Sequence, residues 1–342
     1  MIKRDTTLQR RASLFVAALS AATVLASCGS SVQEVGSKGS KVIGRIGRQP
    51  GQFSKPRAVA TTKSGQIIAV DRTGRMQSYS LKTGEFVKQW RFPAYENGTP
   101  TGISVDPIDD SIWVADTHYG RVLKYDQDGN LLFQFGELGE ERGKFVFLTD
   151  VCPDPDGRTL WITDYGMRNR VMQFTRYGEF VNEWGPPVYE NADLDRPMAV
   201  VVAPDGKSLF VLDNGNARVN QYTRDGALIG AWGRAGSAPG ELKMPQDMAL
   251  APDNTLYIVE YGNSRVSRFT LEGEFLGVWG EPGNAPGQLG TPWGVAVAHT
   301  GELVLADTLN HRLQLLRQPE KFFHPAQPQL ALNVPPVSRK DL

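Results

Sequence analysis

The segment "ADTLNHRLQLL", residues 306–316, brings together residue types that perform chemistry. Asp307, Asn310, His311 and Arg312 lie within six positions, directly after the apolar run "ELVL". A carboxylate, an imidazole and a guanidinium at this spacing could bind a metal ion or take part in acid–base catalysis. An active site needs one such constellation, so the interpretation depends on whether the pattern occurs once.

The pattern occurs six times. Apolar runs end in an acid at Asp71, Asp116, Asp164, Asp213, Glu260 and Asp307, at intervals of 45, 48, 49, 47 and 47 residues. An arginine follows each acid, at Arg75, Arg121, Arg170, Arg218, Arg265 and Arg312. Repetition favours a structural role, in which carboxylate and guanidinium fix a hairpin through charge-assisted hydrogen bonds. Asn216, Asn263 and Asn310 precede their arginines by two positions, where a turn tolerates left-handed backbone or side-chain bonds to the backbone.

Each repeat contains four short apolar runs separated by polar turns. The runs of the fourth repeat are "PMAVVV", "SLFVLD", "RVNQYT" and "LIGAWG". Four strands per repeat of this length are typical of a propeller blade. The sixth repeat lacks its fourth strand, and "VIGRIG", residues 42–47, can supply it. The sequence therefore predicts an all-β fold, a six-bladed β-propeller of four-stranded blades over residues 41–318, closed by an N-terminal strand that completes the last blade.

The repeats resemble the NHL repeat family over about 80% of the chain. The resemblance rests on the loops "PGQF" and "PGQL", each followed by a proline, on "VDPIDDSIWVADTHYGRVLKY" and on "ADTLNHRL". It implies a six-bladed propeller. It does not decide the function, because propellers serve as lyases, hydrolases and binding platforms.

The nearest enzymatic resemblance is to peptidylglycine amidating lyase, whose zinc histidines follow the proline that opens an inner strand. The equivalent positions here are Arg57, Thr101, Thr149, Met198, Gln246 and Trp293. Zinc needs three or four close ligands, whereas the four histidines, His118, His299, His311 and His324, are scattered through the chain. The sequence therefore predicts neither catalytic nor metal-ligating residues, and it leans against an enzyme.

The sequence leaves open the possibility of a divalent cation on the propeller axis. Six-bladed gluconolactonase-like enzymes, a second resemblance, bind a divalent cation through Glu, Asn and Asp. Asp150 and Asp247 lie one place beyond the inner-strand openings and could face the axis. Two carboxylates are few for calcium, which takes six to eight oxygens, although backbone carbonyls could complete the set. The sequence predicts no cofactor except this structural ion.

The inner-strand openings should surround a funnel on one face of the propeller. The expected funnel residues are Arg57, Thr101, Asp150, Met198, Gln246, Asp247 and Trp293, with Tyr165 and Tyr261, which follow repeat acids. Tryptophan, tyrosine and arginine are the residues that anchor interfaces. We therefore expect a protein or small ligand to bind here; in the alternative interpretation, Met198 and Trp293 only plug the channel.

Two interblade loops depart from the "PGQF" type and share the tripeptide "YEN". These are Tyr95, Glu96 and Asn97 in one loop, and Tyr189, Glu190 and Asn191 in the other. The hypothesis is that both loops contact a partner in the cell envelope. In the alternative interpretation they pack on neighbouring blades.

The N-terminal residues 1–27 have the plan of a secretory signal, with a basic start and an apolar run of 14 residues. "LASC" resembles the lipobox of bacterial lipoproteins, which implies cleavage before Cys28 and lipidation of that residue. Residues 28–40 then form a flexible tether, and the Pro-rich tail 319–342 is expected to be extended. Gly29 implies, by resemblance to sorting rules, the periplasmic side of the outer membrane.

Removal of the signal leaves 33 basic and 36 acidic groups. A nucleic-acid partner is not expected, because no basic patch is apparent. Cys152 is then the only free thiol, so no disulfide framework exists. The sequence as a whole favours a lipid-anchored envelope protein that binds a ligand or serves as a scaffold; the alternative is a metal-dependent lyase or hydrolase on the same fold.

Overall fold

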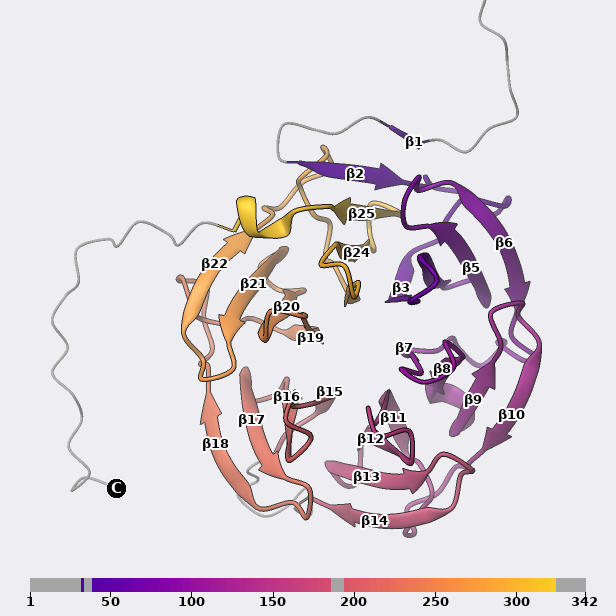
Figure 1. Ribbon diagram of the computed structural model, residues 1–342, viewed down its shortest axis with the longest axis vertical. Coiled ribbons are helices and arrows are strands. Elements are labelled where there is room, and N and C mark those ends of the chain that lie inside the picture. Colours follow the sequence, from indigo (N-terminus) through magenta and orange to yellow (C-terminus); the bar gives the residue numbers. More distant parts are fainter. Residues whose placement is uncertain (1–31, 34–38, 186–193, 324–342) are drawn as a thin grey trace, which may run out of the picture.

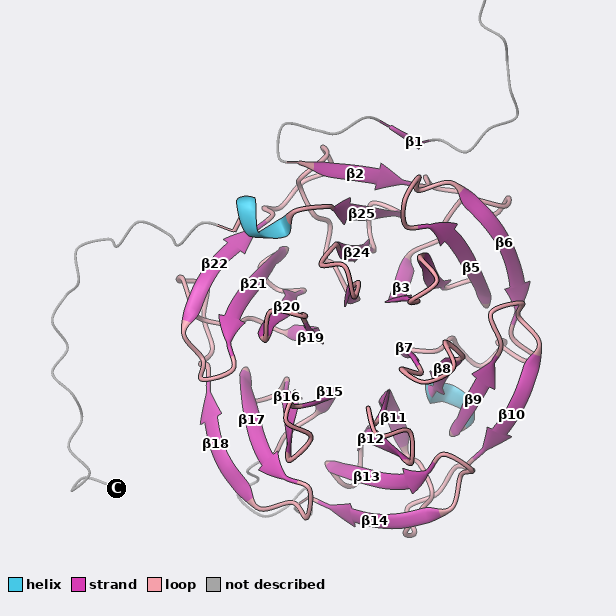
Figure 2. Ribbon diagram, in the orientation of Figure 1, coloured by secondary structure: helices cyan, strands magenta, loops and turns pink. Residues whose placement is uncertain are grey.

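The structure, a computed structural model, describes residues 32–33, 39–185 and 194–323. Six antiparallel sheets stand around a central axis as the blades of a β-propeller (Figure 1). The predicted fold class is confirmed. Within the described residues the only helices are two 3-10 turns, η1 (Thr117–Tyr119) and η2 (Pro319–Lys321), drawn in cyan in Figure 2. No helix in this part of the chain has the length and apolarity to cross a bilayer.

The strands run outward from the axis in chain order within blades 1 to 5. Blade 1 contains β3 (Pro56–Thr61), β4 (Gln66–Asp71), β5 (Arg75–Ser80) and β6 (Phe86–Arg91). Blade 2 contains β7 (Gly102–Val105), β8 (Ile112–Asp116), β9 (Arg121–Tyr125) and β10 (Leu131–Phe135). Blade 3 contains β11 (Phe147–Pro153), β12 (Thr159–Tyr165), β13 (Arg170–Thr175) and β14 (Phe180–Trp184).

The remaining blades repeat this plan. Blade 4 contains β15 (Pro197–Val202), β16 (Ser208–Asp213), β17 (Arg218–Thr223) and β18 (Leu228–Trp232). Blade 5 contains β19 (Pro245–Leu250), β20 (Thr255–Glu260), β21 (Arg265–Thr270) and β22 (Phe275–Trp279). Blade 6 contains β23 (Val295–Val297), β24 (Leu303–Asp307), β25 (Arg312–Leu316) and the N-terminal strands β2 (Ser40–Ile43) and β1 (Val32–Gln33).

The core lies between the blades. The second strand of every blade is almost wholly buried, because both faces of the blade pack against a neighbour. Six apolar clusters result, and each joins two adjacent blades around the ring. This explains why these strands read as unbroken apolar runs rather than as alternating ones.

The ring closes through β2, which pairs with β25 from Ser40↔Leu316 to Ile43↔Leu313. The prediction of an N-terminal closing strand is confirmed, but the predicted bounds, 42–47, were wrong at both ends. Gly44 has φ +78° and turns the chain, and a Cβ there would lie 2.6 Å from the Phe53 ring. The strand therefore ends at Ile43, and Ile46 instead forms a parallel bridge with Phe53 in the following loop.

Both segments that flank the propeller contain structure that the sequence did not predict. Val32–Gln33, inside the predicted flexible tether, pairs with β2 as a short fifth strand. The first residues of the predicted extended tail form η2, after which the Phe323 ring packs 5.0 Å from the Tyr257 ring. The signal segment, Cys28, and residues 324–342 lie outside the described residues.

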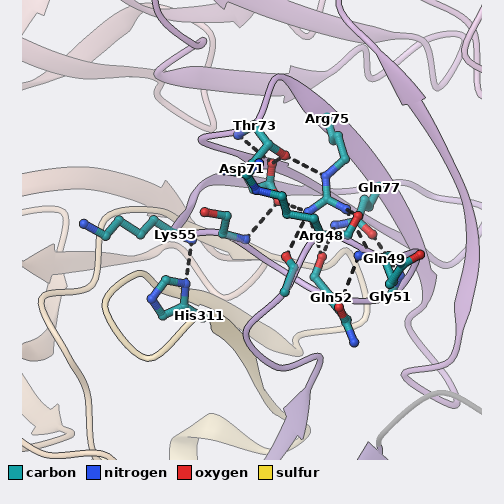
Figure 3. Close-up of polar contacts among 12 residues, drawn as sticks. Arg48, Gln49, Gly51, Gln52, Lys55, Asp71, Thr73, Arg75, Gln77 and His311 are labelled. Atoms are coloured by element: carbon teal, nitrogen blue, oxygen red, sulfur yellow. Dashed lines mark hydrogen bonds and ion pairs between the residues drawn. The ribbon is translucent and has the colours of Figure 1, made fainter.

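All six acid–arginine pairs form ion pairs across their hairpins, as predicted. In blade 1, Arg75 binds Asp71 and donates 2.7 Å and 3.0 Å hydrogen bonds to the carbonyls of Arg48 and Gln52 (Figure 3). The carboxylate of Asp71 in turn accepts the amide of Ser54. The pairs of blades 3, 4, 5 and 6 also bind the loops that enter their blades, so these pairs do more than fix a hairpin. Among the described residues, the Asp116–Arg121 pair of blade 2 makes no such bond.

The turn asparagines behave only partly as expected. The side-chain amides of Asn263 and Asn310 donate to the repeat acid and also to the carbonyls of Gly236 and Gly283. The left-handed residue, however, is the next one along the chain, as at Ser264 with φ +49° and His311 with φ +56°. Of the two roles expected of these asparagines, the side-chain bond to the backbone is therefore confirmed at Asn263 and Asn310, and the left-handed backbone falls on the next residue.

Candidate functional site

β-Bulges set the direction of the side chains at the inner-strand openings. The pairing register shifts between Pro56 and Ala58 in blade 1, and equivalent shifts occur in blades 3, 4 and 5. A bulge leaves one residue without a partner and re-aims its side chain. The unpaired residues are Arg57, Thr149, Met198 and Gln246, the positions at which the resemblance to amidating lyase would have placed zinc histidines.

Asp150 and Asp247 lie on inner strands and line a central cavity of about 290 Å³ formed by the inner strands of all six blades. Asp150 accepts the amides of Val151 at 2.9 Å and of Val200, in the next blade, at 3.1 Å. Asp247 accepts Met248 at 2.8 Å and Val295, again one blade on, at 2.9 Å. Each carboxylate thus connects two inner strands.

The two acids interact with each other, and neither pairs with a basic side chain in the described part of the chain. Burial raises the pKa of Asp150 to about 6. Burial, followed by the negative charge of Asp150, raises the pKa of Asp247 well above its usual value. Each carboxylate has further lone pairs beyond those that accept amides. A divalent cation at this pair stays a prediction, to be checked by metal analysis of the purified protein and of variants at both aspartates.

The Asp247→Asn variant should have a flatter pH profile of stability than the unaltered protein. An unfolded aspartate has a pKa of about 3.9, so the native state binds more protons than the unfolded state from about pH 4 to above pH 6. The free energy of unfolding contributed by the pair therefore falls as pH rises through this range. The unaltered protein should therefore lose more free energy of unfolding than the variant as pH rises. We expect this change to shift the difference in free energy of unfolding by about 1 kcal/mol or more in favour of the variant from pH 5 to pH 8.

Urea denaturation in the presence of a chelator, at pH 5 and pH 8, measures this difference. The Glu272→Gln variant is the matched control, because Glu272 is exposed. Parallel profiles for Asp247→Asn and the unaltered protein would contradict the assignment of a buried, repelling pair.

Arg57 is the central basic residue of the funnel. Its guanidinium lies over the Trp293 ring at 4.2 Å from the centroid, and the Trp293 and Tyr261 rings meet edge to face at 5.9 Å. The Nε–H of Arg57 is buried without a hydrogen-bond partner, and the side chain forms no ion pair with the described residues. Burial and then repulsion from Arg72 lower the pKa of Arg57 to about 10. Three predicted funnel residues, Arg57, Tyr261 and Trp293, therefore come together.

Four other predicted funnel residues make contacts within their own blade or with the next one. Thr101 is buried and donates to the Thr149 carbonyl at 2.8 Å. Met198 packs against the apolar cluster between blades 4 and 5. Gln246 is buried and donates to its own loop, at the Met244 carbonyl. Tyr165 packs on Phe147 with ring centroids 4.8 Å apart, although it lies close enough to Arg57 to interact electrostatically.

Sequence reasoning missed three residues of the funnel, Lys55, Arg72 and His118. Lys55 and Arg72 line a small cavity of about 180 Å³ with Arg57, Tyr261 and Trp293. Burial and then repulsion from Arg57 and Arg72 lower the pKa of His118, which places this side chain in the same positive field. A signal for Arg72 was present, because it follows a repeat acid, as Tyr165 and Tyr261 do.

His311, the residue that first suggested chemistry, has a structural role. Its Nδ1 accepts the backbone amide of Lys55 at 3.1 Å, which joins blade 6 to blade 1. Figure 3 shows the Lys55 side chain extending away from the Asp71–Arg75 network. The imidazole is thus bound to the backbone at the point where the ring closes.

The "YEN" loop at residues 95–97 is tied to its surroundings. The Tyr95 ring packs over Gly74, where a Cβ would lie 2.2 Å from the ring, and the Arg91 guanidinium lies 5.6 Å from the ring centroid. Glu96 and Asn97 are exposed, and both interact with the hydroxyl of Tyr119. Contact with a partner stays a prediction for this loop. The second loop, with Tyr189, Glu190 and Asn191, lies outside the described residues.

The donor set does not fit the zinc of an amidating lyase. None of the inner-strand openings carries a histidine, and no group of three or more His, Cys, Asp and Glu side chains gathers among the described residues. Cys152 lines the central cavity, but burial raises the pKa of its thiol, which disfavours the thiolate that binds metals. We therefore derive no chemistry through zinc.

Sequence comparison finds relatives that match part of the chain, and no family model matches it. Brain tumor protein of Drosophila melanogaster is 28% identical over 39% of this chain, and rat peptidylglycine alpha-amidating monooxygenase is 28% identical over 35%. Peptidyl-alpha-hydroxyglycine alpha-amidating lyase 1 of D. melanogaster is 24% identical over 47%. The matches span only 12%, 13% and 36% of these relatives' lengths.

Solved structures share the fold at low identity. A streptogramin B lyase has a TM-score of 0.53 at 15% identity, covering 80% of this chain and 96% of its own. A gluconolactonase of Xanthomonas campestris has a TM-score of 0.59 at 17% identity, covering 78% and 86%. The comparisons support an NHL-like β-propeller. These similarities concern the architecture of the chain and do not show its activity.

Proposed function

We propose that this protein is a ligand-binding propeller whose binding site is the funnel around Arg57 and Trp293. The observation that carries the proposal is the Arg57 guanidinium, which lies on Trp293 at the inner-strand openings with its Nε–H buried and no acidic partner among the described residues. A desolvated charge without a counter-ion is costly to a folded protein. A ligand that satisfies it explains why the residue is tolerated there, since the six acid–arginine pairs hold the blades without its help.

A ligand-observed NMR screen tests this proposal. Saturation-transfer spectra of neutral, cationic and anionic small molecules are recorded with the unaltered protein and with Trp293→Ala. We expect at least one class of molecule to lose its signal in Trp293→Ala and to keep it in Tyr177→Ala, because Tyr177 is a 75% exposed aromatic residue outside the funnel. If no class of molecule distinguishes Trp293→Ala from the unaltered protein, the funnel is not the binding site.

We also propose that the propeller acts in the cell envelope, held by a lipid on Cys28. The support is the order of a basic segment, an apolar run and "LASC" in residues 1–28. A protein anchored in this way would present the funnel to soluble ligands or to an envelope partner, for which the exposed Glu96 and Asn97 provide a contact surface. Gly29 after the cysteine favours the periplasmic side of the outer membrane.

Expression in an enterobacterial host provides the test of anchoring. The unaltered protein should incorporate a labelled fatty acid and sediment with membranes, whereas Cys28→Ala should lose the label. Cys152→Ala is the matched control, because this half-buried thiol lies in the propeller and should leave labelling unchanged. A Cys28→Ala variant that still carries the label would overturn the proposed anchor.

The alternative is a metal-dependent lyase or hydrolase on the same fold. Its support is the enzyme class in the names of a relative and of two solved neighbours: an amidating lyase, a streptogramin B lyase and a gluconolactonase. Their identities to this chain are 24%, 15% and 17%. None of the six inner-strand openings of this chain carries an imidazole, which the lyase resemblance requires for zinc, so binding is the function that the geometry supports best.

A further inference from the structure

The seam between blades 6 and 1 contains a pocket that is positively charged, partly aromatic and rich in unused hydrogen-bond donors. Its volume is about 180 Å³, and its lining includes Lys55, Arg57 and Arg72 from blade 1, Thr291 and Trp293 from blade 6, and Tyr261 from blade 5. Its size is below the range of about 300–1,000 Å³ that holds a whole drug-sized ligand. It therefore suits a small molecule or one end of a larger one.

The donors of this pocket lack partners. The Nε–H of Arg57 and the hydroxyl of Thr291 are both buried and make no hydrogen bond to any residue that the structure describes. Buried polar groups in folded proteins are nearly always hydrogen-bonded, so an orphaned donor calls for an explanation such as a ligand. Two residues that line one cavity thus each carry an orphaned donor, which favours a ligand that accepts hydrogen bonds.

The charges of this pocket also lack partners. The side chains of Lys55, Arg57 and Arg72 form no ion pair with any described residue, and the nearby carboxylate of Asp71 is bound by Arg75. Arg57 and Arg72 repel each other, and both act on His118 from the neighbouring blade. Three unopposed cations around a small cavity call for an anion.

The aromatic walls define the rest of the ligand. The Trp293 ring carries the Arg57 guanidinium on one face and meets the edge of Tyr261. A planar guanidinium pairs with a carboxylate through two parallel hydrogen bonds. A flat or apolar group attached to that carboxylate would rest against the two rings.

We propose that this seam pocket binds the carboxylate group of a small aromatic or apolar acid, with Arg57 as its principal partner and Thr291 as a second donor. This inference rests on the proposed function, because it names the chemical class of the ligand that the funnel binds. The bound acid would contact the first and the last blade together, at the place where the ring closes.

Isothermal titration calorimetry with benzoate and its neutral isostere benzamide tests the proposal. We expect benzoate to bind at least tenfold more tightly than benzamide, and Arg57→Met to weaken benzoate binding at least tenfold. Thr291→Val, which keeps the shape but removes the orphaned hydroxyl, should weaken benzoate binding severalfold. Arg234→Met is the matched control, since the Arg234 side chain is 79% exposed and pairs with Glu241 outside the pocket.

Inorganic phosphate is titrated as a second anion. Tighter binding of phosphate than of benzoate, equal binding of benzoate and benzamide, no benzoate binding, or an unchanged affinity in Arg57→Met would each overturn the carboxylate assignment. Thermal denaturation of Arg57→Met shows whether the variant folds, and Thr291→Val gives an independent measure if it does not. A neutral molecule that depends on Trp293 in the saturation-transfer screen would preserve the proposed function while the carboxylate assignment fails.

Discussion

Replacing Asp307 by alanine should lower the free energy of unfolding by about 3–5 kcal/mol. Asp307 is fully buried and accepts four different donors: the amide of Gly290 at 2.7 Å, and side-chain nitrogens of Asn310, Arg312 and Gln314 at 2.7–2.9 Å. The truncation leaves the buried Arg312 guanidinium without its counter-ion. It also leaves the loop that enters blade 6 without its anchor.

Asp116→Ala, the equivalent change in blade 2, should cost less than half as much. Asp116 is equally buried, but it accepts only the Nε–H of Arg121, and its Oδ1 has no hydrogen-bond partner. Burial raises the pKa of Asp116 to about 6, which shows that its carboxylate is poorly compensated. Two of the three missing donors follow from the sequence, because Leu123 occupies the place of Gln314 and Tyr119 the place of Asn310.

Urea denaturation of both variants at pH 7 measures the two losses. Equal losses would contradict the argument, because they would mean that the number of donors to the repeat acid does not determine its contribution. The comparison therefore tests whether the loop contacts, and not the hairpin ion pair alone, make the repeated acid structurally important.

The repeat could be recognised from sequence because each acid–arginine pair is a local interaction. Asp71 and Arg75, for example, lie on directly paired positions of adjacent strands, so their spacing determines their contact. The closing strand could be recognised from the missing fourth strand of blade 6. Its end could not be placed, because the turn at Gly44 depends on the Phe53 ring, which packs over it.

The funnel could be predicted only in part, because equivalent positions in a repeat have different neighbours. The position after the opening proline is Arg57 in blade 1 and Thr101 in blade 2. The threonine hydroxyl reaches the carbonyl of Thr149 in the next blade, whereas the longer guanidinium lies on Trp293 of the preceding blade. Such contacts between blades join residues about 48 or more than 200 positions apart, and no local pattern encodes them.

Replacing Ile43 by alanine should destabilise the ring at its closure by about 2–5 kcal/mol. Ile43 is fully buried in the cluster between blades 6 and 1, where it pairs with Leu313 of β25 and packs with Phe53. The lost contacts belong to β2, which is the strand that joins the N-terminal segment to the last blade (Figure 1). The loss should therefore act locally before it acts on the whole fold.

Hydrogen exchange distinguishes these two effects. We expect protection of the β25 amides to fall more in Ile43→Ala than protection of the β13 amides in blade 3, because local opening of β2 exposes the edge of β25 first. Lys41→Ala is the matched control, since Lys41 is only partly buried and its ammonium bonds to the Thr83 carbonyl at the surface. If protection fell equally in all blades, the substitution would destabilise the whole fold, and the expected local opening of β2 would be contradicted. Because the seam pocket lies at the same junction, a ligand bound at Arg57 should partly restore protection of β25 in Ile43→Ala.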